Sequence, residues 1–156
     1  MKNKKLSWKQ IDTYCDKLAK QITDVNYRID SIISIGRGGM IPARILADRL
    51  SIQSIYVMNV TLYNMHRTDT STLKILPFNH NIEKQHILLI DDIIDSGVTL
   101  TASMDEISKR RISGMRTACL LCKETVTRKP TFYADEAKTD QWIVFPWEQS
   151  EFKGMK

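Results

Sequence analysis

The chain has 156 residues, of which 42% are apolar and 26% are charged, and its formal net charge is +5 at pH 7. This composition is typical of a globular domain and argues against a disordered chain. The apolar runs are only a few residues long, whereas a membrane-spanning helix needs about 20 apolar residues. The basic residues 1–5 are not followed by the apolar segment of a secretory signal. We therefore expect a single domain over residues 1–156, a cytoplasmic location and no membrane partner.

The first half of the chain predicts a helix and then a strand, a helix and a strand. Ser7 and Gln10 have the spacing of a capping box, and apolar residues then recur at helical intervals over residues 8–22. Residues 31–35 are short, apolar and rich in isoleucine, which favours a strand, and a glycine-rich turn follows at 36–39. Pro42 suits the first turn of a helix that runs to about Leu50, and residues 55–60 alternate like a strand. Strand, helix and strand in this order are typical of a parallel sheet.

The second half continues this pattern after a polar interruption. Residues 61–74 are polar and show no periodicity, which predicts a long loop that acts as a mobile lid. Residues 86–90 then favour a buried strand, 91–99 a loop, and the residues from Leu100 a helix that closes near Gly114. Residues 116–122 and 142–145 predict two further strands, the last one stopped by Pro146. The expected fold is α/β, with a mostly parallel central sheet flanked by helices.

The cysteines and the basic residues narrow the classes of cofactor and partner. Three cysteines are an odd number, so we expect reduced thiols rather than a disulfide framework. Cys119 and Cys122 have the CxxC spacing, but residues three apart on a strand point to opposite faces and no nearby histidine completes a zinc site. This predicts buried structural cysteines. The basic pairs are scattered, so a small phosphorylated ligand suits the charge as well as nucleic acid does, and residues 1–5 are expected to form a solvated tail.

The loop after the strand at 86–90 has the features of a phosphate site. Ser96, Gly97 and Thr99 offer backbone N–H groups and two hydroxyls where a helix begins, and a helix N-terminus favours anions. At the carboxyl edge of a parallel sheet, where ligands bind, the glycine-rich turn at 36–39 should lie nearby.

Three neighbouring acids modify this interpretation. Asp91, Asp92 and Asp95 would repel an anion, so a ligand with sugar hydroxyls, a bound Mg²⁺ ion, or both is needed to offset the repulsion. A ribose phosphate that carries Mg²⁺ meets these demands. A nucleoside triphosphate site is the competing interpretation, but the GxxxxGK[ST] motif is absent from the sequence, and the turn at 36–39 lacks the third glycine of a dinucleotide fingerprint.

These residues resemble motifs of the type I phosphoribosyltransferases, which use 5-phosphoribosyl 1-pyrophosphate (PRPP). Residues 87–99 resemble the ribose-phosphate-binding motif: four apolar residues, two acids, two apolar residues, and then Asp95, Ser96, Gly97, Val98 and Thr99. Residues 36–42 resemble the pyrophosphate loop of the purine branch. Residues 142–148 resemble the segment that closes over the base in the bacterial xanthine-guanine enzymes of this family.

The resemblance implies a fold with a lid at about 61–74 and a small base-binding hood at about 124–156. It implies that Asp91 and Asp92 hold the ribose hydroxyls, directly or through Mg²⁺, and that Asp95 exchanges a proton near purine N7. Arg37 and Gly38 would hold the pyrophosphate. The 5′-phosphate would be bound by Asp95, Ser96, Gly97, Val98 and Thr99.

The resemblance also implies a base site and a metal site. Lys123 would donate a hydrogen bond to the purine O6, Trp142 would stack on the ring, and Ile143 would offer backbone contacts. The Mg²⁺ ion, the expected cofactor, would be bound by Asp91, Asp92 and Glu148. The substrates would be PRPP and a free 6-oxopurine, and the family suggests a homodimer or homotetramer.

Several positions leave alternatives open. Lys123 alone could be a solvated lysine, and Trp142 could belong to the core. Glu148 stands where the xanthine-guanine members have aspartate, Glu124 follows Lys123 where they favour proline, and Leu62 and Tyr63 stand where a Ser-Tyr pair is expected in the lid. Nucleic acid is not expected as a partner. The alternatives are a PRPP-sensing regulator that binds nucleic acid through Arg110, Arg111 and Arg116, and a transferase for another base.

Overall fold

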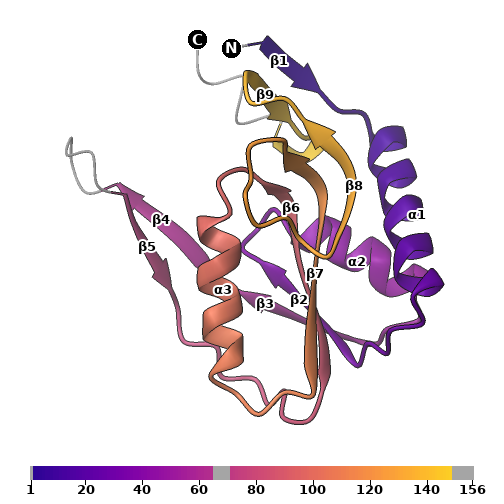
Figure 1. The fold of residues 1–156 in the computed structure, drawn as a ribbon, viewed down its shortest axis with the longest axis vertical. Helices are drawn as coiled ribbons and strands as arrows, with labels where there is room; N and C mark the ends of the chain where they lie inside the picture. Colours follow the sequence, from indigo (N-terminus) through magenta and orange to yellow (C-terminus); the bar gives the residue numbers. More distant parts are fainter. Residues whose placement is uncertain (1, 65–70, 149–156) are drawn as a thin grey trace.

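A computed structural model of the chain describes residues 2–64 and 71–148 (Figure 1). The helices of this described part are α1 (Trp8–Asp24), α2 (Met40–Arg49), α3 (Val98–Ser108) and the short 3-10 helix η1 (Pro146–Glu148). Its strands are β1 (Lys2–Lys5), β2 (Ser31–Ile35), β3 (Ser54–Met58), β4 (Val60–Asn64), β5 (Ser71–Ile75), β6 (His86–Ile94), β7 (Gly114–Lys123), β8 (Phe132–Ala137) and β9 (Gln141–Val144).

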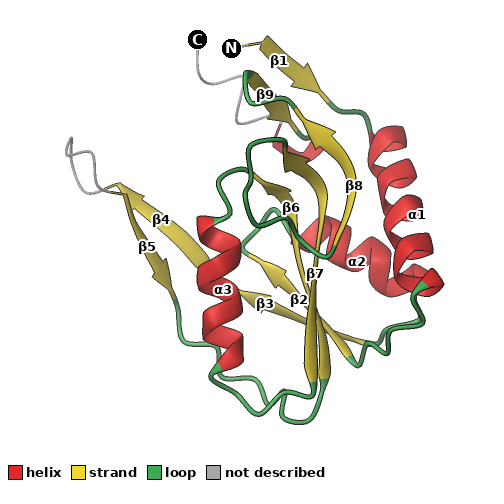
Figure 2. Cartoon of the chain, viewed as in Figure 1, coloured by secondary structure: helices red, strands yellow, loops and turns green. Residues whose placement is uncertain are grey.

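The central sheet has five strands in the order β3-β2-β6-β7-β8, and every neighbouring pair in it is parallel. Helices α1 and α2 cover one face of the sheet and α3 covers the other (Figure 2). The expected α/β fold with a mostly parallel, helix-flanked sheet is therefore confirmed. Because all five strands run the same way, the loops that follow β2 and β6 open at the same edge of the sheet.

Strand β6 lies between the two halves of the core. Leu88 and Ile90 pack in a cluster with α1 and α2, whereas Ile87 and Leu89 pack in a second cluster with α3. All four side chains are fully buried. Successive side chains of a strand point to opposite faces, so a strand that is covered on both faces is apolar at every position. This explains why a continuous apolar run predicted β6.

Helix α1 begins as its capping box predicts. The Gln10 N–H donates to Ser7 Oγ at 3.3 Å, and the Ser7 N–H donates to Gln10 Oε1 at 2.9 Å. The spacing of Ile11, Cys15 and Leu18 places all three side chains in the core. At 17 residues α1 is the longest helix of the described part, in which no helix is long and apolar enough to cross a membrane.

The prediction of an aperiodic loop over residues 61–74 is wrong, because β4 and β5 form an antiparallel hairpin there. Val60 pairs with Ile75 and Asn64 pairs with Ser71. Apolar residues alternate with polar ones only over 60–62 and 73–75, and these two stretches are too short to predict a hairpin without their backbone pairing. The tip of the hairpin, residues 65–70, lies outside the described residues.

Two other segments also form strands that their sequences did not predict. Residues 1–5 were expected to form a tail, but β1 pairs in parallel with β9, with Asn3 opposite Trp142. Four basic and polar residues give no apolar signal even when their backbone is paired. β8 is an edge strand of the central sheet, so part of the segment expected to form the hood belongs to that sheet. Residues 149–156 lie outside the described residues.

The two cysteines of the CxxC spacing lie in one buried cluster, on the α3 face of the sheet. The expectation that they point to opposite faces is wrong, because Leu120 and Leu121 both pack on the other face and the alternation of β7 slips by one residue. The expectation of buried, unbridged thiols is confirmed for Cys15, Cys119 and Cys122.

Candidate active site

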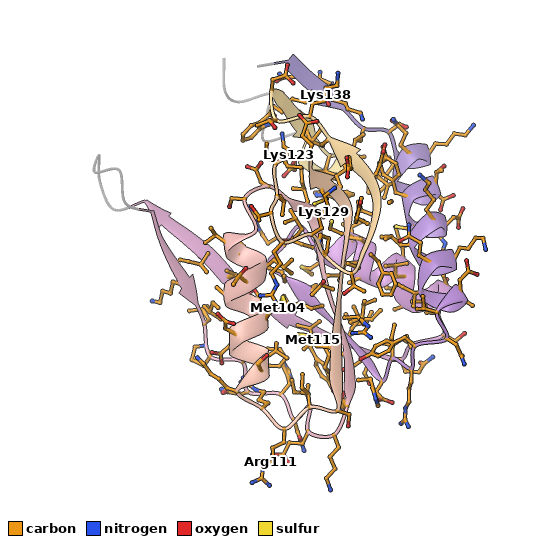
Figure 3. All side chains as sticks on the ribbon, in the orientation of Figure 1. Met104, Arg111, Met115, Lys123, Lys129 and Lys138 are labelled. Carbon is orange, nitrogen blue, oxygen red and sulfur yellow. The ribbon has the colours of Figure 1, made fainter. Side chains whose placement is uncertain are left out.

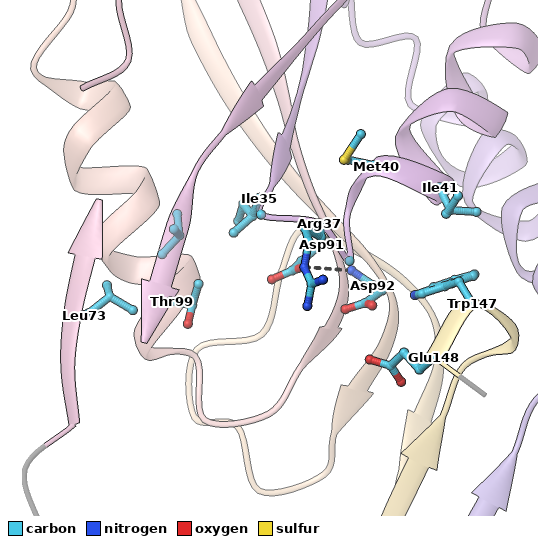
Figure 4. A pocket seen from close by; sticks show the side chains of 13 residues that line it. Ile35, Arg37, Met40, Ile41, Leu73, Asp91, Asp92, Thr99, Trp147 and Glu148 are labelled. Carbon is cyan, nitrogen blue, oxygen red and sulfur yellow. Dashed lines mark hydrogen bonds between the residues drawn. The ribbon is translucent and has the colours of Figure 1, made fainter. Parts of the chain in front are cut away.

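A cavity of about 490 Å³ opens at the edge of the sheet where β2 and β6 end (Figure 4). The turn after β2 contributes Arg37 and Gly38 to its wall, and the end of β6 contributes Asp91 and Asp92. Glu148 of η1 also lines this cavity. Thr99 lines it as well, so six of the predicted site residues, which the sequence spreads over more than a hundred positions, meet around one cavity.

The glycines of the turn allow three chain segments to approach closely. Gly36 has φ +53°, a conformation that residues with a Cβ rarely adopt. A Cβ at Gly39 would lie 2.4 Å from the Ile90 carbonyl oxygen, so glycine lets the start of α2 touch β6. A Cβ at Gly38 would lie 2.4 Å from Asp92 Oδ2. The pyrophosphate-type turn and the acidic pair are thus packed directly against each other.

The acidic pair is held in place at an electrostatic cost. The Asp92 N–H donates to Asp91 Oδ1 at 3.0 Å, and the Ile93 N–H donates to Asp92 Oδ1 at 2.8 Å. Burial, with a contribution from Asp92, raises the pKa of Asp91 well above its usual range. Burial, with a contribution from the Glu148 charge, raises the pKa of Asp92 to about 6. The ionised carboxylates are therefore disfavoured in the ligand-free protein, and a bound cation or hydroxyl donors would stabilise them.

Glu148 is fixed so that it faces the acidic pair. Its Oε2 accepts the Phe145 N–H at 3.2 Å. Figure 4 shows its carboxylate and that of Asp92 on the same side of the cavity, below the ring of Trp147. The segment 142–148 therefore brings a third carboxylate to a cavity that β6 already supplies with two.

The predicted phosphate loop lines a second, smaller cavity of about 140 Å³. Gly97 has φ +81° and precedes α3, whose N-terminus begins at Val98. Asp95, Ser96 and Gly97 line this space with Thr99 and Asp91. Thr99 and Asp91 also line the larger cavity, so the two cavities adjoin. The loop 91–99 differs from expectation in one respect, because its first four residues are the end of β6.

The residues present fit a Mg²⁺ ion that a substrate shares. Asp91, Asp92 and Glu148 line one cavity and offer the oxygen ligands that Mg²⁺ prefers. Among the described residues these carboxylates do not already form a three-ligand metal cluster. Mg²⁺ usually takes one or two carboxylates and completes its shell with waters and substrate phosphates, so an incomplete set of protein ligands suits a metal that arrives with substrate.

The residues predicted to bind the base lie at the end of β7 and on β9. Lys123 is buried, and its ammonium group donates to the carbonyl oxygens of the turn 138–141, so the alternative of a solvated lysine is wrong. Trp142 is 49% exposed, which excludes the alternative of a core tryptophan. Ile143 is buried. Within the described residues, none of these three lines the 490 Å³ cavity.

Trp147 lines the cavity beside Glu148 and was not among the predicted site residues. Its indole partly offsets the rise in the Asp92 pKa. The ring stacks on Phe145 with 4.8 Å between centroids, and Trp8 packs against it at 5.8 Å. Its place beside Glu148 in the sequence could have identified Trp147 as a residue of the cavity. Val60 and Leu73 also line the cavity and were not predicted as site residues. Val60 was expected to end a strand, and Leu73 was expected to lie in a loop.

Comparisons with known proteins agree with this geometry. The phosphoribosyl transferase domain family matches residues 7–151. A xanthine-guanine phosphoribosyltransferase of Desulfotalea psychrophila is 30% identical over 148 residues, which are 94% of this chain and 88% of that protein. The corresponding protein of Cereibacter sphaeroides is 28% identical over 93% of this chain and 86% of its own length.

Solved structures are similar over almost the whole chain. A purine phosphoribosyltransferase of Pyrococcus horikoshii superposes with a TM-score of 0.80 at 30% identity and covers 94% of this chain and 95% of its own. A hypothetical protein of Neisseria gonorrhoeae with bound ppGpp superposes with a TM-score of 0.81 at 25% identity. The match covers 94% of this chain and 89% of that protein.

Proposed function

Because the chain belongs to the phosphoribosyltransferase family, and to its purine branch, we propose that it transfers the phosphoribosyl group of PRPP to a free 6-oxopurine. The products are a purine nucleoside 5′-monophosphate and pyrophosphate. The base is guanine, xanthine or hypoxanthine, and Mg²⁺ accompanies PRPP.

One observation carries this proposal. The larger cavity joins Arg37 and Gly38 to Asp91 and Asp92, and it shares Asp91 and Thr99 with the smaller cavity of the phosphate loop. A ligand that spans both cavities needs one anionic group beside Arg37, another at the start of α3, and hydroxyl groups between them. In PRPP the ribose hydroxyls lie between the diphosphate and the 5′-phosphate, as this arrangement requires.

The residues of the site suit a displacement at ribose C1. Arg37 binds the diphosphate and neutralises the charge that develops on it as the C1–O bond breaks. Asp91 and Asp92 hold the ribose 2′ and 3′ hydroxyls and stabilise positive charge on the sugar. Asp95 accepts or donates the proton at purine N7. When Mg²⁺ is bound, it adds further charge neutralisation on the leaving diphosphate.

The base contacts follow from the same proposal. Trp142 stacks on the purine, Ile143 supplies backbone contacts, and Lys123 donates to O6. Trp142 is 49% exposed, so a ligand can reach part of its side chain, which supports this assignment. Glu148 binds Mg²⁺ or the base edge. Its position near the Asp92 carboxylate favours the metal.

The hairpin of β4 and β5 is proposed to act as the lid. Val60 and Leu73 form part of the cavity wall, so the hairpin already borders the site. A cover at this position would keep water from C1 and suppress hydrolysis of PRPP.

The alternative of a nucleic-acid-binding regulator receives less support. Two of its three arginines make contacts within the protein, because Arg110 pairs with Glu106 at 3.0 Å and Arg116 lies over the Tyr27 ring at 4.8 Å. Arg111 is exposed. A basic surface that binds nucleic acid needs several arginines directed to solvent.

An assay with separate bases tests the proposed function. The protein is incubated with PRPP, Mg²⁺ and one base at a time, and nucleotide and pyrophosphate are quantified by chromatography and ³¹P NMR. We expect equal amounts of both products with at least one 6-oxopurine, and none with adenine or orotate. Turnover with adenine or orotate alone would assign another base. Salt-sensitive binding of nucleic acid without any turnover would favour the regulator.

A further inference from the structure

A buried ammonium group lies at the end of β7, outside the large cavity. Lys123 is only 6% exposed. Its Nζ donates to the carbonyl oxygens of Lys138 at 3.0 Å and Thr139 at 3.5 Å, and also to that of Gln141. Figure 3 shows Lys123 at the same end of the molecule as Lys138, close to the start of β9. Within residues 2–64 and 71–148, none of the ion pairs found includes Lys123. Its charge is therefore compensated by carbonyl dipoles.

The turn that Lys123 holds leads directly into the predicted base-binding strand. Residues 138–141 precede Trp142 and Ile143 without a break. The next residue, Glu124, holds the same turn from its other side, because its N–H donates to the Ala137 carbonyl at 3.1 Å and its Oε1 accepts the Thr139 N–H at 3.3 Å. The end of β7 therefore binds both the carbonyl and the N–H groups of this turn.

We propose that Lys123 and Glu124 act as positioning residues, which anchor the turn 138–141 and so fix where β9 presents Trp142 and Ile143 to the base. This inference rests on the proposed function and deepens it. Glu124 is a departure from the residues that the family favours after the lysine, and the anchoring gives this departure a structural reason.

The Lys123 ammonium group can bind the turn and the base at the same time only if its hydrogen bonds are rearranged. A lysine has three N–H donors, and the three carbonyls use all of them. A contact with purine O6 therefore requires one carbonyl to be released. The Thr139 carbonyl, at 3.5 Å, makes the longest and weakest of these bonds and is released first. The Lys138 and Gln141 carbonyls remain bound, so β9 keeps its position while the base is held.

Hydrogen exchange of the ligand-free protein tests the anchoring without any turnover. In the Lys123→Met variant, which keeps the chain length but lacks the ammonium group, the amides of residues 139–143 should exchange about fivefold faster or more, as expected for the loss of at least one hydrogen bond. The matched control is Lys129→Met, which removes an exposed lysine that pairs with Glu136 and should leave these amides unchanged.

Steady-state kinetics separates positioning from general loss of structure. Lys123→Met should raise the KM for the purine about tenfold while the KM for PRPP changes less than about twofold, because only base binding depends on β9. Unchanged exchange at 139–143 together with a higher purine KM would overturn the proposal, since Lys123 would then act on the base alone.

The Glu124 variants keep the test decisive if Lys123→Met does not fold. Glu124→Ala should accelerate exchange of the same amides, and Glu124→Gln, which retains an acceptor oxygen, should restore protection. Equal exchange in the native protein, Glu124→Ala and Glu124→Gln would contradict the anchoring. If the native protein showed no transfer activity, the proposed function would fail, yet the exchange data would still decide whether the turn is anchored.

Discussion

At the scale of single residues, the ionised Asp92 carboxylate should make the ligand-free protein less stable. Its pKa is raised to about 6 by burial and by the Glu148 charge, so near pH 7.5 the folded state holds a carboxylate in a place that disfavours charge. We expect Asp92→Asn to raise the free energy of unfolding by about 1 kcal/mol or more, because the amide oxygen can still accept the Ile93 N–H. Urea denaturation at pH 7.5 without Mg²⁺ measures this difference. Asp95→Asn, at an exposed residue, is the control and should change stability by less than about 0.5 kcal/mol.

The same two variants should affect catalysis in different ways. Asp95→Asn removes the group that exchanges a proton with the base, so we expect kcat to fall about 100-fold or more while the KM for PRPP changes little. Asp92→Asn weakens the hold on the ribose, so the KM for PRPP should rise. Initial rates over a range of PRPP concentrations distinguish the two. Equal and negligible effects of both substitutions would contradict the assigned roles.

A side chain at Gly38 is predicted to weaken PRPP binding because it would displace the Asp92 carboxylate. A Cβ at Gly38 would lie 2.4 Å from Asp92 Oδ2, so Gly38→Ala must displace that carboxylate. We expect a higher KM for PRPP, with stability reduced by only about 1 kcal/mol because a side-chain end can move. A double-mutant cycle with Asp92→Ala provides the check. If the clash is the cause, Gly38→Ala should have little further effect once Asp92 is truncated, and full additivity would refute it.

At the scale of elements, Asp30 ties the start of β2 to the start of β6. Its Oδ2 accepts the His86 N–H at 2.8 Å, and Arg28 donates to its Oδ1 at 2.8 Å. The backbone N–H of His86, followed by Arg28 and the His86 ring, lowers the pKa of Asp30 below its usual value. This contribution to stability is therefore fully present above about pH 4, the unfolded pKa, and is lost as the pH falls through the lower folded pKa.

Asp30→Asn should accordingly lower the free energy of unfolding by about 1 kcal/mol at pH 7, and the difference should shrink below about pH 4. Denaturation curves of both proteins between pH 3 and pH 7 measure this. Asp24→Asn, which affects only an exposed pair with Lys20, is the control. A deficit that stayed constant down to pH 3 would show that the charge of Asp30 is not responsible.

The elements that the sequence predicted are those whose residues carry their own signal. β2 and β6 are buried on both faces and are therefore rich in apolar residues, and the capping box marks the start of α1. β1 was not predicted because its residues are basic and polar and pairing with β9 stabilises it. The hairpin of β4 and β5 was not predicted because each strand is only five residues long and apolar and polar residues are mixed in both. β8 was missed for a related reason, because its two acidic residues are exposed at the edge of the sheet.

At the scale of the whole molecule, the parallel order of β2 and β6 creates the site. Both strands end at one edge, so Arg37 and Gly38 come to lie against Asp91 and Asp92 although more than fifty residues separate them. The motifs predicted these residues because each depends on a local pattern of glycines, acids and hydroxyls. The part played by Trp147 could not be read in the same way, because it arises from packing between η1, α1 and the end of β6.

The crystal structure of the protein with PRPP and Mg²⁺ tests most directly whether the two cavities hold one ligand. The account predicts density for the diphosphate beside Arg37 and Gly38, for the 5′-phosphate at residues 95–99, and for ribose oxygens within hydrogen-bonding distance of Asp91 or Asp92, directly or through the metal. A 5′-phosphate bound elsewhere, or a ribose whose hydroxyls avoid both carboxylates, would contradict it.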